Sequence, residues 1–249
     1  MMRATEFEFR QRFFCIGCVF GLGFFCYSFD HVTAAFAVAH LLGGKSLNLD
    51  SPAGMRALHL IFGFGAVLCI LAALIRTWAA AYLHSEIVHD HALHSENLVA
   101  DGPYRHVRNP LYIGGVLLGA GIGLMASRTG WFVITLGLFV FYHRLIFREE
   151  AALTASQGES FRAFCARVPR FFPALLPRVD ASGAPPRWSQ AFAGEVFMWG
   201  FAAAVVAFAV TLSLTVFYVV IGVGFAAYFV YWLIARRARQ KSQKPPATA

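Results

Sequence analysis

Long apolar runs separated by short polar segments dominate the chain. The first run covers residues 13–42 and is interrupted by Asp30 and His31, and the second covers residues 57–82. Apolar stretches of this length are typical of helices that cross a bilayer. The first run is either one long tilted helix or a helix followed by an interfacial half, and we place the Asp30–His31 pair at the membrane interface.

A helical hairpin is expected in the middle of the chain. Residues 111–126 and 131–147 form the third and fourth predicted spans, joined by a short polar turn. Such a tight hairpin brings the start of the third span close to the end of the fourth. A surface helix over residues 151–166 should follow, with Leu153, Phe161, Phe164 and Cys165 as its apolar positions, and then a proline-containing linker.

The last apolar run, residues 195–234, is too long for one span. A single helix of 40 residues would be about 60 Å long, twice the thickness of the hydrocarbon layer. We therefore predict two spans with a break near residues 212–215. The fold class is all-α, a polytopic membrane bundle of about six helices, divided into N-terminal helices (1–83), a central core (84–180) and a C-terminal hairpin with a basic tail (181–249).

The charge distribution indicates the orientation of the bundle. The 249 residues are 58% hydrophobic, and 21 Lys and Arg against 13 Asp and Glu give a net charge of +8. The basic residues lie mainly in segments beside alternate ends of the spans, so topology explains them better than nucleic-acid binding does. We expect a multi-pass protein of a bacterial inner membrane with both termini on the cytoplasmic side, and no nucleic-acid partner.

Cysteine and histidine spacing does not predict a metal site. Four of the five cysteines lie within apolar stretches, and the Cys15-x-x-Cys18 pair has no second pair beside it. His89-x-His91-x-x-His94 matches no strong zinc pattern, so a solvated histidine-rich connector is the favoured interpretation.

The most informative polar run covers residues 98–112. Asp101-Gly102-Pro103 is typical of a turn, whereas Asn109-Pro110 resembles a helix start, with Asn as the N-cap that accepts from a free backbone N–H and Pro at the first helical position. Arg105 and Arg108 beside a helix N-terminus would bind a carboxylate or phosphate. The alternative is that these residues only anchor the helix at the interface.

A second polar element, Arg148-Glu149-Glu150, follows the fourth predicted span. Because of the hairpin, Asn109 and Glu149 should lie at the same membrane face. The simpler interpretation of this charged triplet is the solvated end of a helix.

Two blocks of sequence carry a resemblance to a known family. They are Leu98-Val-x-x-Gly-Pro-Tyr-Arg-x-Val-Arg-Asn-Pro-Leu-Tyr-x-Gly114, and Glu149-Glu150-x-x-Leu153 followed by Gly158-Glu-x-Phe161 and Val168-Pro-Arg170. In these blocks the chain resembles the isoprenylcysteine carboxyl methyltransferase family of integral-membrane methyltransferases and the related phospholipid methyltransferases.

The resemblance implies a site for S-adenosylmethionine at the cytosolic ends of the helices, with a lipid-like or prenylated small substrate entering from the bilayer. Glu149 would bind the amino group or the ribose hydroxyls of the cofactor, and Tyr104 and Tyr112 would pack against its adenine or sulfonium. The implied cofactor residues are His89, Glu96, Asn97, Leu98, Val99, Tyr104, Arg105, Arg108, Asn109, Pro110, Leu111, Tyr112 and Glu149; Arg144, Arg148, Glu149 and Glu150 are the candidate catalytic residues.

Two departures from the family pattern affect the implied chemistry: Asn109 is not titratable, so no general base is assigned there, and Leu145 weakens the case for a prenylcysteine carboxylate as acceptor. Asn109 stands where the family often has His, and Leu145 stands where enzymes acting on a prenylcysteine carboxylate have Arg, between Arg144 and Arg148. Carboxyl methylation of an isoprenylcysteine-type acceptor remains one hypothesis. The alternatives are N- or S-methylation of a phospholipid or small hydrophobic acceptor, and a non-catalytic scaffold or transporter. The oligomeric state is not predicted, and the last two spans are expected to serve in anchoring or dimer contacts.

Overall fold

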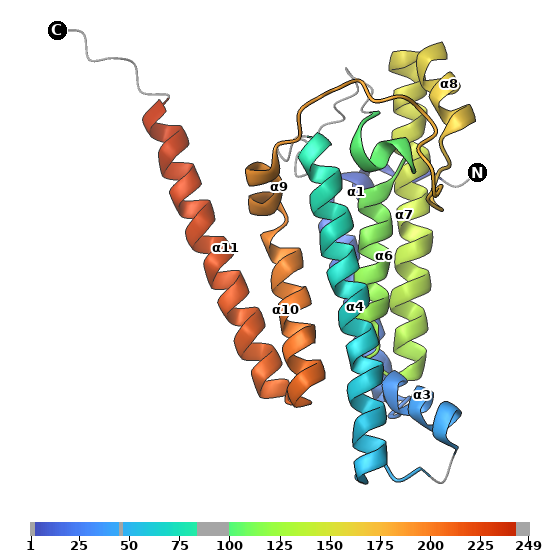
Figure 1. Cartoon of the computed structure of the whole chain (residues 1–249), viewed down its shortest axis with the longest axis vertical. Helices are drawn as coiled ribbons and strands as arrows, with labels where there is room; N and C mark the ends of the chain where they lie inside the picture. The colour runs from blue at the N-terminus through green and yellow to red at the C-terminus, as the bar shows by residue number, and fades with distance from the viewer. Residues whose placement is uncertain (1–2, 45–46, 84–99, 243–249) are drawn as a thin grey trace, which may run out of the picture.

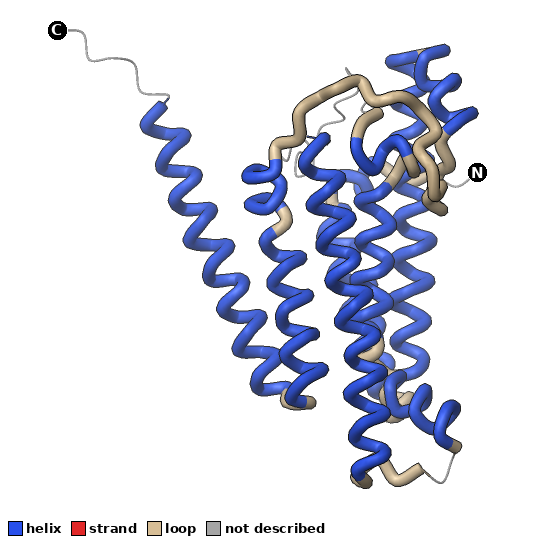
Figure 2. The backbone as a smooth tube through the Cα atoms, in the orientation of Figure 1, coloured by secondary structure: helices blue, strands red, loops and turns tan. Residues whose placement is uncertain are grey.

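The structure, a computed structural model, is a bundle of helices (Figures 1 and 2). It describes residues 3–44, 47–83 and 100–242, with side chains up to residue 233, and contains no β-strand within those ranges. The elements in chain order are α1 (Glu6–Arg10), α2 (Arg12–Phe25), the 3-10 turn η1 (Cys26–Ser28), α3 (Ala34–Gly43), α4 (Pro52–Leu83), the 3-10 turn η2 (Gly102–Arg105), α6 (Pro110–Gly123), α7 (Arg128–Gln157), α8 (Glu159–Arg167), α9 (Trp188–Gly194), α10 (Val196–Thr211) and α11 (Leu214–Ser242).

The helices confirm the predicted all-α membrane-type bundle, although not every predicted span has spanning length. Within the described ranges, α4, α7 and the apolar part of α11 are long and apolar enough to cross a membrane, and α9 with α10 adds a fourth candidate if this bent pair is counted as one span. Helices α2, α3 and α6 are apolar but shorter. Helix α6 ends at Gly123, where the chain turns. Its 14 residues give a length of about 21 Å.

The first apolar run is not one continuous helix. It is divided into α2 and α3, and Figure 1 shows α3 turning away from the bundle axis. The carboxylate of Asp30, between them, accepts hydrogen bonds from the backbone N–H and hydroxyl of Thr129, at 2.8 and 3.0 Å, and pairs with Arg128 at 3.0 Å. A negative charge beside the first turn of α7 is favoured by the helix dipole. The interruption therefore fixes the N-terminus of α7.

Helix α7 extends further than the sequence predicted. It continues through the charged triplet to Gln157, so the prediction of a separate surface helix beginning at residue 151 was wrong. The helix ends at Gly158, whose φ is +56°, and α8 follows from Glu159. Charged side chains did not end the helix because they have partners in the fold. The predicted break in the last apolar run is confirmed, since α10 ends at Thr211 and α11 begins at Leu214.

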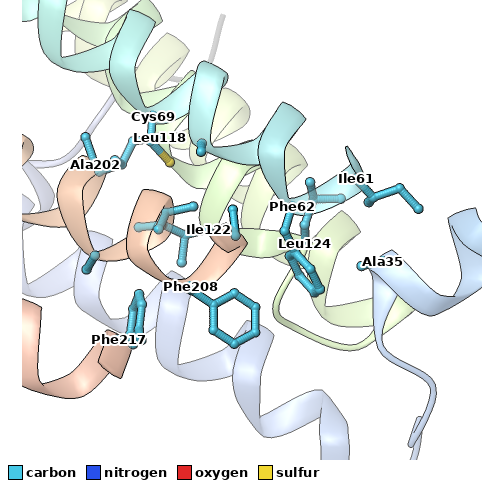
Figure 3. Close-up of a cluster of buried hydrophobic side chains, with 14 of the residues drawn as sticks. Ala35, Ile61, Phe62, Cys69, Leu118, Ile122, Leu124, Ala202, Phe208 and Phe217 are labelled. Carbon is cyan, nitrogen blue, oxygen red and sulfur yellow. The ribbon is translucent and has the colours of Figure 1, made fainter. Parts of the chain in front are cut away.

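The main apolar core lies between α4, α6 and α10 (Figure 3). Phe62 of α4 and Phe208 of α10 meet edge to face, with ring centroids 4.8 Å apart. Helix α6 has buried glycines, among them Gly115 and Gly119, and their small size permits close packing of the neighbouring helices. Helix α11 packs on α10 and diverges from the other helices (Figure 1). The core thus joins the central helices to α10 and leaves α11 at the periphery.

Candidate functional site

The candidate site lies at the end of the bundle where η2, the start of α6 and the end of α7 meet, the same end as the N-terminus in Figure 1. The hydroxyl of Tyr112, in the first turn of α6, donates a hydrogen bond of 2.6 Å to Oε1 of Glu149 in α7. The ring of Tyr112 also lies 5.1 Å, between centroids, from the ring of Tyr142. The hairpin therefore brings the two polar elements together, as the sequence predicted.

Glu150 forms a separate cluster beside Glu149. Its carboxylate pairs with Arg108 at 3.3 Å and with Arg170 at 2.9 Å. The guanidinium of Arg170 also lies over the ring of Phe147, 4.9 Å from its centroid. Arg108, expected to hold an anionic ligand, is therefore already neutralised by a carboxylate of the chain. Glu150 therefore holds the segment after α8 against the start of α6 and the last part of α7.

Asn109 precedes α6 as predicted, but its side chain does not cap the helix. Its amide Nδ2 donates to the carbonyl of Arg170 at 3.0 Å and to Oε1 of Glu150 at 3.4 Å, and no side-chain cap bond forms. The prediction of an N-cap hydrogen bond was wrong because Asn109 is used as a donor in the Glu150 cluster. Pro110 occupies the first helical position as expected.

The turn before α6 places Tyr104 inside the site. Gly102 has a φ of +55°, and a Cβ there would lie 2.3 Å from the ring of Tyr82, so the turn requires glycine. Tyr104 is only 7% exposed, and its hydroxyl has no hydrogen-bond partner among the residues that the structure describes. Burial raises the pKa of Tyr104, and the nearby charge of Glu149 raises it further. Tyr104 therefore remains a neutral hydroxyl available to a ligand.

Arg105 contacts the linker that follows α8. Its Nε donates to the carbonyl of Val179 at 2.9 Å, and its own carbonyl accepts from the backbone N–H of Arg178. Beside it, the carboxylate of Asp101 accepts hydrogen bonds from Ser182 and from the backbone N–H of Ala184. The hydrogen bond from Ser182 lowers the pKa of Asp101. The predicted linker is therefore fixed across η2, a role that its composition did not indicate.

Arg144 and Arg148 pair with the N-terminal helix. Arg144 donates to Glu8 at 2.7 Å, and Arg148 pairs with Glu6 and donates to the carbonyl of Ala4 at 3.2 Å. The hydrogen bond from Arg144 lowers the pKa of Glu8. The assignment of both arginines to catalysis stays a prediction, and in this structure their charges are balanced by α1.

Leu111, another predicted cofactor residue, lies in the first turn of α6. The backbone carbonyl of Leu111 accepts a hydrogen bond of 3.3 Å from Arg76, a residue that the sequence did not assign to the site. The signal that could have indicated Arg76 was a single charge within an apolar stretch.

Five of the predicted cofactor residues lie outside the described ranges. They are His89, Glu96, Asn97, Leu98 and Val99, and the other histidines of the 84–99 connector lie outside these ranges as well.

A family model matches the part of the chain that carries these residues. Residues 60–159 match the model of the phospholipid methyltransferase family, a stretch that contains η2, α6 and α7. The match confirms the resemblance to integral-membrane methyltransferases related to that family. Together with the apolar helices, it supports an integral membrane protein.

Two relatives align with part of the chain. The cobalt-zinc-cadmium resistance protein CzcN of Cupriavidus metallidurans is 29% identical over 144 residues, which cover 58% of this chain and 62% of that protein. The nickel-cobalt-cadmium resistance protein NccN of Alcaligenes xylosoxydans xylosoxydans is 29% identical over 105 residues, 42% of this chain and 46% of that protein. Each alignment spans less than two thirds of the relative. No solved structure matches the chain.

Proposed function

We propose that this chain is a membrane methyltransferase that uses S-adenosylmethionine and methylates a lipid-like acceptor. The observation that carries the proposal is the hydrogen bond between Tyr112 and Glu149, beside the unpartnered hydroxyl of Tyr104. These groups lie in the stretch that matches the phospholipid methyltransferase family.

The polar groups of this site fit the cofactor. The carboxylate of Glu149 can accept hydrogen bonds from an ammonium group or from ribose hydroxyls, and the Tyr104 hydroxyl lacks the partner that a buried polar group requires. The tyrosine rings provide surfaces for a heterocycle or a sulfonium. When bound, S-adenosylmethionine supplies an electrophilic methyl group, so the chain itself needs to orient the reactants and exclude water.

Glu149 and Glu150 have different roles in this proposal. Glu150 is held by Arg108, Arg170 and Asn109, and it maintains the shape of the site. The hydrogen bond from Tyr112 orients the carboxylate of Glu149 for the cofactor. Arg144 and Arg148 would have to leave their present partners before they could bind the acceptor, because Arg144 pairs with Glu8 and Arg148 pairs with Glu6.

The acceptor is proposed to be an amphiphile that reaches the site from the bilayer. The helices that carry the site expose large apolar side chains, such as Phe132, Leu136 and Val140 of α7, to the surroundings of the bundle. An isoprenylcysteine-type carboxylate is one candidate acceptor, and the amine of a phospholipid or a small hydrophobic thiol is the other. We place the site on the cytoplasmic side of a bacterial inner membrane, because most of the basic residues lie at this end. The names of the two relatives suggest heavy-metal resistance as the setting of the activity.

Calorimetric titration of the detergent-purified protein tests the proposal. We expect S-adenosylmethionine and S-adenosylhomocysteine to bind, and Glu149→Ala to weaken binding by about 1–3 kcal/mol through loss of a charged hydrogen-bond acceptor. Glu159→Ala is the matched control, since Glu159 is an exposed residue of α8 outside the site. A well-folded wild type that binds neither compound, or a Glu149→Ala variant with unchanged affinity, would overturn the site.

A further inference from the structure

A buried ion pair connects the C-terminal helices to the core below the candidate site. Nε of Arg76 in α4 lies 2.7 Å from Oε2 of Glu195, and Nη2 donates to Oε1 at 2.9 Å. The side chain of Arg76 is 13% exposed and that of Glu195 is 0% exposed. Glu195 lies at the junction between α9 and α10, where the two helices are bent by 61°. The pair thus joins this bend to α4.

The same arginine reaches the helix that carries the site. Its third nitrogen, Nη1, donates to the carbonyl of Leu111 at 3.3 Å, in the first turn of α6 and directly before Tyr112. At Gly114 a Cβ would lie 2.5 Å from Cγ of Arg76, so α6 has space for the arginine only because it has glycine there. Arg76 therefore contacts α6 on both sides of Tyr112.

The pair also acts on the electrostatics of Tyr104. The charge of Arg76 opposes, and that of Glu195 supports, the rise in the pKa of Tyr104 that burial causes. Both side chains are thus within electrostatic range of the unpartnered hydroxyl. The ion pair is linked to the start of α6 by the hydrogen bond from Arg76 to the carbonyl of Leu111.

Stability alone does not account for the pair. Apolar residues of similar volume often replace a buried ion pair without loss of stability, because desolvation offsets the attraction between the charges. Helix α10 already packs on α4 through Phe62 and Phe208, and Nε1 of Trp199 donates to the hydroxyl of Thr77 at 3.0 Å. What the ion pair adds is a rigid, directional contact to the first turn of α6.

We propose that Arg76 and Glu195 form a positioning pair through which the C-terminal hairpin orients the first turn of α6 and, with it, Tyr112. The inference rests on the proposed function for its effect on the cofactor. It gives α9 and α10, which lie beyond the stretch that matches the family, a role in the site as well as in anchoring.

The test replaces both charges at once, so that no unpaired charge remains buried. We expect the double variant Arg76→Met/Glu195→Met to unfold at a temperature close to that of the wild type and to bind S-adenosylmethionine at least tenfold more weakly. Amides of residues 111–114 should exchange with deuterium faster than in the wild type. Trp199→Phe removes the neighbouring α4–α10 hydrogen bond without touching α6, and should leave both the affinity and the exchange unchanged.

A second variant covers the case in which the double variant does not fold. Arg76→Lys keeps a positive charge opposite Glu195 but lacks the forked donors needed to reach Leu111 as well. The same loss of affinity and of protection is expected. A folded variant of either kind with wild-type affinity or wild-type exchange would overturn the positioning role. A wild type that binds no cofactor would instead overturn the proposed function, and the exchange measurement alone would then decide the role of the pair.

Discussion

The hydroxyl of Tyr112 lies 2.6 Å from Oε1 of Glu149 and donates a hydrogen bond to it, although the two residues come from different helices. The α6–α7 hairpin creates this contact by returning the end of α7 to the start of α6. The contact defines the orientation of the carboxylate on which the proposed cofactor site depends.

Tyr112→Phe measures the contribution of the Tyr112 hydroxyl to cofactor binding separately from that of its ring. The variant keeps the aromatic packing against Tyr142 but removes the donor to Glu149, so we expect cofactor affinity to fall by about 1 kcal/mol, less than for Glu149→Ala. Calorimetric titration measures the difference. Tyr218→Phe, at an exposed position of α11, is the matched control. Equal affinities for Tyr112→Phe and the wild type would show that the hydrogen bond does not orient the carboxylate.

Glu150→Ala should act on stability. Its removal leaves Arg108, whose side chain is 10% exposed, and Arg170 without their carboxylate, and we expect a cost of about 1–3 kcal/mol. Thermal unfolding in detergent checks this result. The exposed pair of Glu159 with Arg162 supplies the control, because Glu159→Ala should change stability by less than about 0.5 kcal/mol. A thermal midpoint for Glu150→Ala equal to that of the control would contradict the stabilising role of Glu150.

Asp30 should make the stability of the bundle depend on pH. The backbone N–H of Thr129, followed by the side chain of Arg128, lowers the pKa of Asp30 below its ordinary value. A lowered pKa in the folded state stabilises the protein above the unfolded-state pKa of about 4, and this contribution is lost as the pH falls below that value.

Asp30→Asn should therefore be less stable than the wild type at pH 7, and the difference should narrow as the pH falls below about 4. Thermal midpoints measured across this range test the expectation. Asp50→Asn, at an exposed loop position, should show no such convergence. A constant difference between Asp30→Asn and the wild type at every pH would contradict the role assigned to the carboxylate.

Arg144→Gln tests whether Arg144 binds the methyl acceptor or only holds α1 in place through Glu8. The ion pair predicts that Arg144→Gln and Glu8→Gln lower the thermal midpoint by similar amounts, and that the double variant adds little, with a coupling of up to about 1 kcal/mol. Methyl transfer should change equally in the two single variants. A rate that falls with Arg144→Gln and not with Glu8→Gln would assign Arg144 to the acceptor.

Local patterns predicted much of the helical architecture. Apolar runs, the turn at Gly102 and the proline at the first position of α6 each depend on neighbouring residues, and each appears where expected. The hairpin then required Asn109 and Glu149 to lie at one end of the bundle. The boundary of α7 was less predictable, because whether a charged triplet ends a helix depends on partners elsewhere in the chain.

The sequence by itself therefore determined the class of fold, the order of the helices and the two polar elements of the candidate site. Only the tertiary structure decided which charges meet: Arg76 with Glu195, Arg144 with Glu8, and Glu150 with Arg108 and Arg170. The physical reason is that helix formation depends mainly on residues within a few positions, whereas a charge can be neutralised by any opposite charge that packing brings within about 4 Å. Tertiary packing is thus what separates a carboxylate available to a cofactor from one that holds the bundle together.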